Sequence, residues 1–517
     1  MQAACTVNSP TTFKRNNTHM TRPFLLLSLI LTTIAAQAQT KVFKEVGEDI
    51  ATQIKAISQD NALVGYLAFT RLEKTDVDSF NYRLTIMDEN LNDIGTVDFR
   101  ERRLDLMAVS FEQDVLCLGY VESAMAGVLN GSDARQAYRH AIKKDQLLFQ
   151  FISLKGKIIS TFTSPVVLEA APIYTGGWSY KYASFLKHGI QLENLAGVGF
   201  AAFYGDHDQR ELLLLDAGGH LIKRKKVTVD FPDYFLQTSG SDIYLLTKMH
   251  ITPAEGGYQL HSYSAADSLK KEVVLDLKDR QGNWFKVLSF DNDPTTNKTY
   301  IAGCVINEDR EKDFITAHDL SRSPYLGVFS MTLGPTKADV KTTYSYWTNS
   351  AYPGIDQDGL FAGDNEFYAK YATAFRNFDG STVFVASALV VKRLLGLAKY
   401  KFADAAFVTQ DAKGKLKLDN RIPCDETSYF GPAGKLDAFD HKGFYKVVNQ
   451  DTKTNFIIVD DLTNIYIYNF NNKKLMRTIS HKDGHTIIHV FPAKEGHIMV
   501  SEFDGKAKQT RFSIEAL

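Results

Sequence analysis

The sequence predicts an all-β fold, a β-propeller with eight four-stranded blades, on two observations. Short runs of apolar, β-branched and aromatic residues recur throughout the chain, and long segments with helical periodicity are lacking. Tight turns rich in glycine, aspartate and asparagine punctuate these runs at intervals of roughly 50 to 75 residues. A four-stranded unit that repeats at such a spacing is typical of a propeller blade.

The segment Gly197–Val229 shows the unit most clearly. Val198–Tyr204 and Glu211–Leu215 are apolar, strand-like runs, and Leu221–Val229 alternates polar and apolar residues as an edge strand near water does. Asp216–His220 contains two glycines, which adopt a positive φ without steric cost and therefore favour a tight hairpin. We interpret this segment as three consecutive antiparallel strands.

Seven hairpins of this kind can be recognised along the chain, and two further strand-like runs precede each of them. Their turns are Asp88–Asn92, Lys155–Gly156, Gly218–Gly219, Ala265–Ser268, Gly334–Pro335, Lys413–Gly414 and Asn471–Asn472. They account for seven blades of four strands each.

The two ends of the chain predict an eighth blade. Three strand-like runs follow the last hairpin, His485–Phe491, Gly496–Phe503 and Lys508–Ile514, whereas Lys41–Val46 is an isolated run near the start. Pairing the first run with the last three would leave no open sheet edge. Seven blades, or two stacked β domains divided near residues 349–363, are the alternatives.

Residues 1–38 have the features of a secretory signal peptide. Arg22 supplies a short positive region, Phe24–Ala35 is apolar, and Ala36–Ala38 fits the small-x-small cleavage pattern. We expect translation to start at Met20, cleavage to leave Gln39 near the mature N-terminus, and no membrane span to remain. A retained N-terminal anchor helix is the alternative.

Charge and cysteine content limit the classes of partner. Residues 1–38 contain three basic residues and no acidic ones, so the net formal charge of the remaining chain is −4. Such a balance does not favour phosphate neutralisation, and we expect no nucleic-acid partner. The odd number of remaining cysteines, Cys117, Cys304 and Cys424, does not predict a disulfide framework, although a single bridge stays open. Cys117 and Cys304 lie in apolar runs and are expected in the core.

The longest connections indicate which face of the propeller carries function. If the strands of a blade are called A to D, the long segments are B–C or D–A connections, which emerge on the same side of a propeller. They lie near residues 123–145, 165–181, 307–324, 345–365 and 392–401, and the first contains a candidate helix, Ala134–Lys144. Because function concentrates on elaborated loops over a rigid scaffold, we expect a binding face there.

Strand, Asp/Lys/Asn-x-x-Gly-like turn and strand, repeated over residues 41–517, resemble the large, uncharacterised secreted β-propeller proteins of Gram-negative bacteria. The resemblance implies a protein that is secreted, periplasmic or displayed on the outer surface of such a bacterium. It brings no catalytic residue with it. We expect one propeller domain over residues 39–517, and a monomer.

Aromatic side chains in the long connections are the first candidate site. Trp178, Tyr180, Tyr346, Trp347 and Tyr352 could offer flat apolar faces with a polar edge to a glycan or a protein partner. The alternative interpretation is that these rings fold back over the blade core, as large aromatic side chains usually do.

Two groups of residues are candidate metal ligands. Asp356, Asp358 and Asp364 form an acidic loop around a glycine, a pattern that can hold calcium, although the full ligand pattern of a calcium loop is absent. His485 and His489 would face the same side of an inner strand and could share a metal ion. Solvated loop acids and ordinary strand histidines are the respective alternatives. Apart from calcium, no cofactor is expected.

Three functions remain open on the sequence alone. The leading hypothesis is an exported, non-catalytic propeller that binds a glycan, a peptide or a protein partner through its long loops. The alternative is a carbohydrate-active hydrolase or lyase with its site at the channel mouth, and the third is a structural envelope protein. The chain contains no Gly-x-Ser-x-Gly elbow, phosphate-binding glycine loop or dinucleotide fingerprint.

Overall fold

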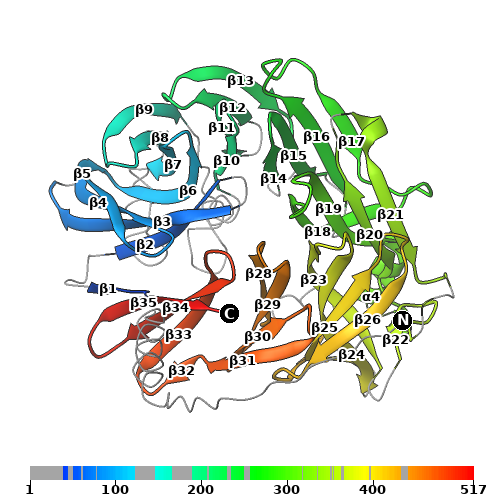
Figure 1. The fold of residues 1–517 in the computed structure, drawn as a ribbon. Coiled ribbons are helices and arrows are strands. Elements are labelled where there is room, and N and C mark those ends of the chain that lie inside the picture. The colour runs from blue at the N-terminus through cyan, green and yellow to red at the C-terminus, as the bar shows by residue number, and fades with distance from the viewer. Residues whose placement is uncertain are drawn as a thin grey trace, which may run out of the picture.

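The computed structural model shows a ring of eight antiparallel sheets (Figure 1). It describes residues 39–44, 51–59, 62–76, 79–122, 146–165, 189–206, 209–229, 234–249, 257–316, 318–334, 336–349, 352, 354–362, 366–394, 397–431 and 440–517. The predicted all-β, eight-bladed propeller is confirmed, and the two alternative architectures are wrong.

The first four blades are regular four-stranded meanders, numbered from the inner to the outer strand. Blade 1 contains β2 (Ala51–Gln59), β3 (Ala62–Lys74), β4 (Ser79–Asp88) and β5 (Asp93–Arg102). Blade 2 contains β6 (Leu104–Glu112), β7 (Val115–Glu122), β8 (Gln146–Ser153) and β9 (Ile158–Pro165). Blade 3 contains β10 (Gln191–Leu195), β11 (Gly199–Asp206), β12 (Gln209–Asp216) and β13 (Leu221–Val227). Blade 4 contains β14 (Tyr234–Ser239), β15 (Asp242–Lys248), β16 (Tyr258–Ser264) and β17 (Val273–Asp276).

The remaining blades carry small additions. Blade 5 contains β18 (Trp284–Asn292), β19 (Thr299–Ile306), β20 (Tyr325–Thr332) and β21 (Lys341–Tyr346), with α4 (Glu308–Ile315) and η1 (Lys337–Asp339) between strands. Blade 6 contains β23 (Phe367–Arg376), β24 (Thr382–Leu394), β25 (Leu397–Gln410) and β26 (Leu416–Ile422), extended by β22 (Leu360–Phe361) and β27 (Thr427–Phe430). Blade 7 contains β28 (Gly443–Asn449), β29 (Thr454–Asp460), β30 (Asn464–Asn469) and β31 (Lys474–Ser480).

The N-terminal strand closes the ring, as predicted. Blade 8 consists of β33 (Thr486–Pro492), β34 (His497–Asp504), β35 (Gln509–Ala516) and, as its outer strand, β1 (Gln39–Lys44), with β32 (Lys482–Asp483) beside β33. Figure 1 shows dark-blue β1 beside red β35. The Phe43 and Phe512 rings meet edge to face at 5.7 Å, and the Lys41 ammonium lies 2.6 Å from the Asp93 carboxylate of blade 1. A cluster of apolar side chains from blades 1 and 8 is buried beside them. The last blade is thus locked to the first.

The predicted hairpin turns hold neighbouring blades together. Gly219, in the C–D turn of blade 3, has a φ of +86° and lies against Ser160 and Phe151 of blade 2. The Ser160 hydroxyl donates a hydrogen bond to the Gly218 carbonyl at 2.6 Å. Gly414 of blade 6 repeats this arrangement, because its carbonyl accepts a 2.6 Å hydrogen bond from Ser345 of blade 5. A side chain at either glycine would occupy the space of the preceding blade.

The long B–C connections of blades 5 and 6 form one small module. The 307–324 connection contains α4, and the 392–401 segment continues β24 and β25 as a longer hairpin rather than as a loop. Phe314 of α4 packs edge to face on Tyr400 of this hairpin, with ring centroids 6.2 Å apart. The segments 123–145 and 166–188 lie outside the described residues, and so does the candidate helix Ala134–Lys144.

Three cysteines lie in the described chain, and none of them is part of a disulfide bond. Cys117 and Cys304 are fully buried, as predicted for core residues, and Cys424 is half-buried. Burial raises the pKa of the Cys424 thiol to about 12, which keeps it protonated at neutral pH. Within the described residues, no helix has the length and apolar character needed to span a membrane.

Candidate binding pocket between the sixth and seventh blades

The structure places two of the candidate aromatic residues in the core rather than on an exposed face. Trp347 is only 2 % exposed, and its Nε1 donates a 2.8 Å hydrogen bond to the Tyr325 carbonyl. Tyr352 is 6 % exposed, and its hydroxyl donates to the Gly414 carbonyl at 3.0 Å. The expected exposure of these two rings is therefore corrected. Both rings can be buried between blades 5 and 6 because the polar atom of each has a backbone hydrogen-bond partner.

The other three aromatic candidates differ from one another. Tyr346 is half-buried, stacks on Tyr344 at 5.9 Å, and donates a 2.9 Å hydrogen bond to the Asp279 carboxylate. Burial and this carboxylate raise the pKa of the Tyr346 hydroxyl well above its usual range, so it stays protonated. Trp178 and Tyr180 lie outside the described residues.

The acidic loop has a structural role that explains its spacing. Asp356 Oδ1 accepts hydrogen bonds from the backbone N–H groups of Asp358 and Leu360 at 2.9 and 2.8 Å. Asp411 makes the same pair of turn contacts in blade 6. Asp358 faces Arg310 at 3.7 Å, and Asp364 lies outside the described residues. The carboxylate of Asp356 is therefore used to close a turn.

The candidate histidines also lie apart from any metal cluster. His489 is exposed on β33, the inner strand of blade 8, and its ring meets that of His481 at 6.0 Å. His481 is itself 2.7 Å from the Asp460 carboxylate. His485 lies in the turn before β33, where its carbonyl accepts a hydrogen bond from Gly505. In the described part of the chain, no three His, Cys, Asp or Glu side chains are arranged to hold a metal ion.

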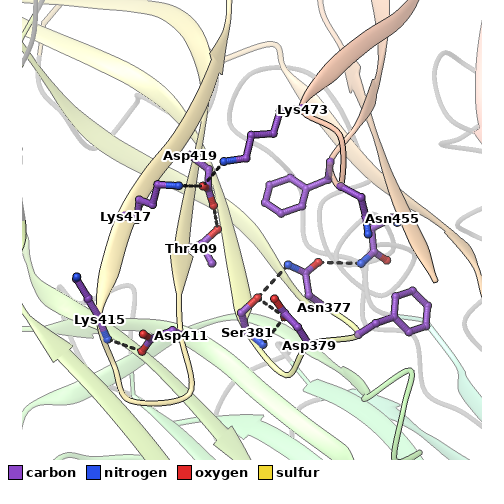
Figure 2. Close-up of a pocket in the computed structure, with 13 residues that line it drawn as sticks. Asn377, Asp379, Ser381, Thr409, Asp411, Lys415, Lys417, Asp419, Asn455 and Lys473 are labelled. Carbon is purple, nitrogen blue, oxygen red and sulfur yellow. Dashed lines mark hydrogen bonds and ion pairs between the residues drawn. The ribbon is translucent and has the colours of Figure 1, made fainter.

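A cavity of about 520 Å³ lies between blades 6 and 7, within the size range of small-molecule sites (Figure 2). Residues from the segments 377–381, 409–419 and 470–473 line it together with Asn455, and we call it the blade 6–7 pocket. These segments are A–B and C–D turns and the strand ends beside them. The pocket thus opens on the tight-turn face, opposite the face that carries the long connections.

Lysines surround one carboxylate on one wall of the pocket. Lys417 and Lys473 lie 2.9 and 2.8 Å from the same oxygen, Asp419 Oδ1, and Thr409 donates a short hydrogen bond to the other oxygen (Figure 2). Burial opposes ionisation of Asp419, but the hydrogen bonds from Lys473, Thr409 and Lys417 hold its pKa below the usual value. Lys415 is also a lining residue, but its side chain points away from Asp419 and Lys473 (Figure 2). At Asp419 two lysines thus meet one carboxylate, whereas the described lining as a whole contains three lysines and three aspartates.

A chain of hydrogen bonds with a fixed direction forms the opposite wall. The Asp379 carboxylate only accepts, so the Ser381 hydroxyl must donate to it, at 2.6 Å. Ser381 Oγ then accepts from the Asn377 amide nitrogen at 3.0 Å, and Asn377 Oδ1 accepts from that of Asn455 at 2.8 Å (Figure 2).

The last member of this chain is left with an unused acceptor. Asn455 is 1 % exposed, and its Oδ1 has no hydrogen-bond partner among the described residues. A buried acceptor without a partner costs roughly 1–3 kcal/mol. This oxygen has no exposed surface, so a bound molecule would reach it only after the Asn455 side chain moves.

Sequence reasoning identified the turns of this pocket but not the pocket. Lys413–Gly414 and Asn471–Asn472 were recognised as hairpin turns, and their polar residues are ordinary turn formers. What makes them a site is the meeting of two blades whose turns lie about 60 residues apart in sequence. An excess of lysines in the C–D hairpin of blade 6, Lys413, Lys415 and Lys417, was the one available signal.

A second polar group lies at the inner ends of the blades. Asp291 of β18 and Lys446 of β28 form a 3.3 Å ion pair beside a cavity of about 110 Å³. Burial, reinforced by the negative charge of Asp291, raises the pKa of Glu193 on β10 to about 8. Glu193 is therefore a carboxyl group that is largely protonated at neutral pH, two blades away from the Asp291–Lys446 pair.

The pKa of Glu193 predicts a pH-dependent stability. Because the pKa in the folded state, about 8, lies above the ordinary value of 4.5, the folded protein holds this proton more tightly than the unfolded chain does. The proton on Glu193 stabilises the folded state fully below pH 4.5, and this contribution is lost as the pH rises to about 8. We expect Glu193→Gln to gain on the order of 2 kcal/mol over the native chain between pH 5 and 9, measured by urea unfolding. A constant difference between the two proteins would contradict this.

The ring of eight blades defines the protein as a β-propeller. Residues 20–130 match the model of a family of unknown function (DUF6770). No curated protein matches the sequence.

Several solved structures resemble the chain at low identity. The WD40 domain of SCAP from fission yeast has 8 % identity, coverage of 92 % of this chain and 98 % of that chain, and a TM-score of 0.41. The Dos1 propeller has 9 % identity, coverage of 92 % and 94 %, and a TM-score of 0.41. Prolyl oligopeptidase B from Galerina marginata has 10 % identity, coverage of 93 % and 58 %, and a TM-score of 0.36. These similarities are too low to transfer a ligand or an activity.

Proposed function

We propose that this chain is an exported, non-catalytic binding protein that holds a small polar ligand in the blade 6–7 pocket. The observation that carries the proposal is the convergence of charged, amide and aromatic side chains from two blades on one cavity of about 520 Å³. Pockets with a few convergent polar groups and apolar lining are the usual form of small-molecule sites. The propeller contributes a rigid frame for turns that are distant in sequence.

The lining of the pocket favours binding over catalysis. Its described lining residues include no histidine or cysteine. Each of its three aspartates accepts hydrogen bonds from its own turn or from lysines: Asp379, Asp411 and Asp419. The pKa of Asp419 lies below its usual value, whereas a general acid at neutral pH requires a raised one.

Binding can be tested with a matched pair of lysine variants. Lys473 lines the pocket, whereas the next residue, Lys474, is exposed and is not part of the lining. In a thermal-shift screen of sugars, sugar acids, amino acids and short peptides, we expect at least one compound to stabilise the native protein. Lys473→Met should reduce that ligand's affinity about tenfold, which corresponds to about 1.4 kcal/mol, and Lys474→Met should not. Equal effects of the two variants would place the ligand elsewhere.

Export is part of the proposal and rests on the signal-peptide features of residues 1–38. We expect the full chain, expressed with a C-terminal tag in a Gram-negative host, to appear in the periplasm or the medium. N-terminal sequencing of that product should begin near Gln39. A product that stays in the cytoplasm with residues 20–38 intact would contradict export.

A hydrolase or lyase of carbohydrates is the second candidate, and one observation favours it. Glu193 carries a proton at neutral pH whereas Asp291 is paired with Lys446, and two carboxyl groups in such different environments suit acid and base roles. Turnover of chromogenic glycosides that disappears in Glu193→Gln would support this candidate over simple binding. Retained turnover in that variant would remove the basis for it.

A further inference from the structure

The outer strands of blades 2 and 3 begin with pairs of exposed aliphatic side chains. These pairs are Ile158 and Ile159 at the start of β9, and Leu221 and Ile222 at the start of β13. The two strand starts adjoin each other, because the Ser160 hydroxyl donates a hydrogen bond to the Gly218 carbonyl of the next blade. Figure 1 shows β9 and β13 on the outer rim of the ring. Single exposed aliphatic residues are ordinary, but four at adjoining strand starts form a patch, which we call the blade 2–3 rim patch.

A β-bulge lies at one aliphatic residue of each pair. In β13, Ile222 lies between the paired residues Leu221 and Lys223 and has no register partner of its own on β12. In β9, Ile159 occupies the same position relative to β8. A bulge changes the direction of a side chain and is a defined feature of a strand. The two blades thus present an aliphatic residue at the same point of their outer hairpins.

Exposed lysines without an ion-pair partner surround the patch. They are Lys155 and Lys157 in the C–D turn of blade 2, and Lys223 and Lys226 on β13. Among the described residues, none of these four forms an ion pair. The other two basic residues of β13 differ, because Arg224 lies 3.4 Å from the Glu211 carboxylate and Lys225 lies 2.9 Å from that of Glu272.

The sequence around the patch leaves this positive charge uncompensated. Residues 153–165 and 216–227 contain six lysine and arginine residues but one acidic residue, Asp216. The Asp216 carboxylate is used within its own turn, where it accepts the backbone N–H of His220 at 2.8 Å and lies 3.0 Å from the His220 ring. The patch therefore combines exposed aliphatic groups with a local excess of positive charge, although the chain as a whole has a net formal charge of −1.

We infer that the blade 2–3 rim patch binds an anionic lipid surface, with its aliphatic side chains among the lipid chains and its lysines at the headgroup phosphates. Aliphatic insertion and the attraction of lysines to anionic headgroups add up at such a surface. A protein partner fits less well, because lysine is depleted in protein interfaces and their strongest contacts come from Trp, Tyr and Arg. The patch lies across the ring from blades 6 and 7 (Figure 1), so this binding is separate from that proposed for the blade 6–7 pocket.

Blade 7 contains the same aliphatic pair with less free charge. Leu475 and Met476 begin β31, and Met476 lies at the bulge. Beside them, Lys473 lies 2.8 Å from Asp419 and Arg477 forms an ion pair with Glu515. We therefore expect the blade 7 pair to contribute little to lipid binding, which makes it an internal control.

The test is sedimentation of the protein, from residue 39 onward, with two kinds of sucrose-loaded vesicle. One kind contains one-third phosphatidylglycerol in phosphatidylcholine, and the other contains phosphatidylcholine alone. We expect binding to the anionic vesicles to be about tenfold stronger, because the lysines are attracted to the negative surface. This binding should weaken as the salt concentration rises from about 0.1 to about 0.5 M, since salt screens that attraction.

A matched pair of variants tests the aliphatic contribution. Ile222 and Met476 are both bulge residues of outer strands, and they are 45 % and 46 % exposed. Ile222→Ser should weaken binding to the anionic vesicles about fivefold, because it removes apolar carbons from the lipid, and Met476→Ser should weaken it less than about twofold. Because the two side chains are equally exposed, both changes should affect the unfolding temperature alike.

Two double variants test the charge contribution. The Lys223→Gln/Lys226→Gln protein and a control, Lys474→Gln/Lys506→Gln, each lose two exposed positive charges. The first should bind the anionic vesicles about tenfold more weakly than the native protein, and the second should change binding less than about twofold.

Three results would overturn the inference. Equal binding to both kinds of vesicle, or no binding to either, would show that the patch does not recognise an anionic lipid surface. Equal losses in the patch and control variants would show a general effect of charge and not a local site. Binding of a soluble polyglutamate peptide that depends on Lys223 and Lys226, without binding to vesicles, would show an acidic protein partner instead of lipid. Ligand binding in the blade 6–7 pocket is measured separately, so none of these results affects the proposed function.

Discussion

Gly219→Ala should destabilise the protein by about 3 kcal/mol, because it strains a turn and separates two blades at once. A Cβ atom at Gly219 would lie 2.1 Å from Ser160 Oγ and 2.6 Å from the ring of Phe151, which is fully buried. The φ of +86° adds a backbone penalty that an L-residue cannot avoid. The midpoint of chemical unfolding measures the loss.

Gly240→Ala is the matched control for this prediction. Gly240 also lies in a tight turn and has a φ of +60°, but no atom lies within 4 Å of the position of its Cβ. Only the conformational penalty applies there, about 1 kcal/mol. If the two variants lose the same stability, the contact between the turn of blade 3 and the outer strand of blade 2 contributes nothing, and the account of blade packing is wrong.

Removal of β1 should open the ring, which is the second large effect. A chain that begins at residue 45 lacks the outer strand of blade 8 and leaves β35 with an unpaired edge. The Phe43–Phe512 contact and the Lys41–Asp93 ion pair are lost with it. We expect about 3 kcal/mol of lost stability and concentration-dependent association in size-exclusion chromatography.

Two point variants separate packing from the loss of the strand itself. Phe43 packs against the cluster between blades 8 and 1, whereas Val42, its neighbour on the same strand, is 46 % exposed. Phe43→Ala should cost about 2 kcal/mol and Val42→Ala less than about 0.5 kcal/mol, with both proteins remaining monomeric. A shortened chain as stable and as monomeric as the native one would show that β1 does not close the ring.

The repeated turns made the fold predictable, because the residues that form each turn can be recognised in a short stretch of sequence. Positive-φ glycines such as Gly156 and Gly219 mark C–D hairpins, and those hairpins are where each blade touches the one before it. Closure could be predicted from the two ends of the chain, where one isolated strand near residue 41 and three strands at the C-terminus together make a blade. Pairing them satisfies the backbone groups of an otherwise open sheet edge. Hydrophobic alternation then placed the remaining strands.

The site could not be predicted in the same way, because it depends on long-range placement. Trp347 and Tyr352 have the composition of a binding surface, yet backbone carbonyls within reach of their polar atoms allow both to be buried. Asp356 has the spacing of a cation loop, yet its Oδ1 closes a turn as Asp411 does. Asn455 and Lys473 belong to no sequence motif. They line a cavity only because blade 7 packs on blade 6.

The face of the propeller that carries the binding site was also hard to predict from the sequence. Loop length identified the face with the long B–C and D–A connections, whereas the blade 6–7 pocket lies among the short turns on the other side. Short turns are rigid, and the Asp411 turn is fixed by two backbone hydrogen bonds from its own carboxylate. Rigid donors and acceptors lose little entropy on binding, which suits recognition of a small polar molecule.

Hydrogen–deuterium exchange tests the central claim, that the ligand site lies between blades 6 and 7 on the tight-turn face. It is measured with and without the compound that stabilises the native protein most in the thermal-shift screen. The account predicts slower exchange in residues 377–381, 411–415 and 470–473 of the saturated protein, and no change in the Asp356 turn on the opposite face. Protection confined to residues 354–362 or to the 392–401 hairpin, with the three pocket turns unaffected, would contradict it.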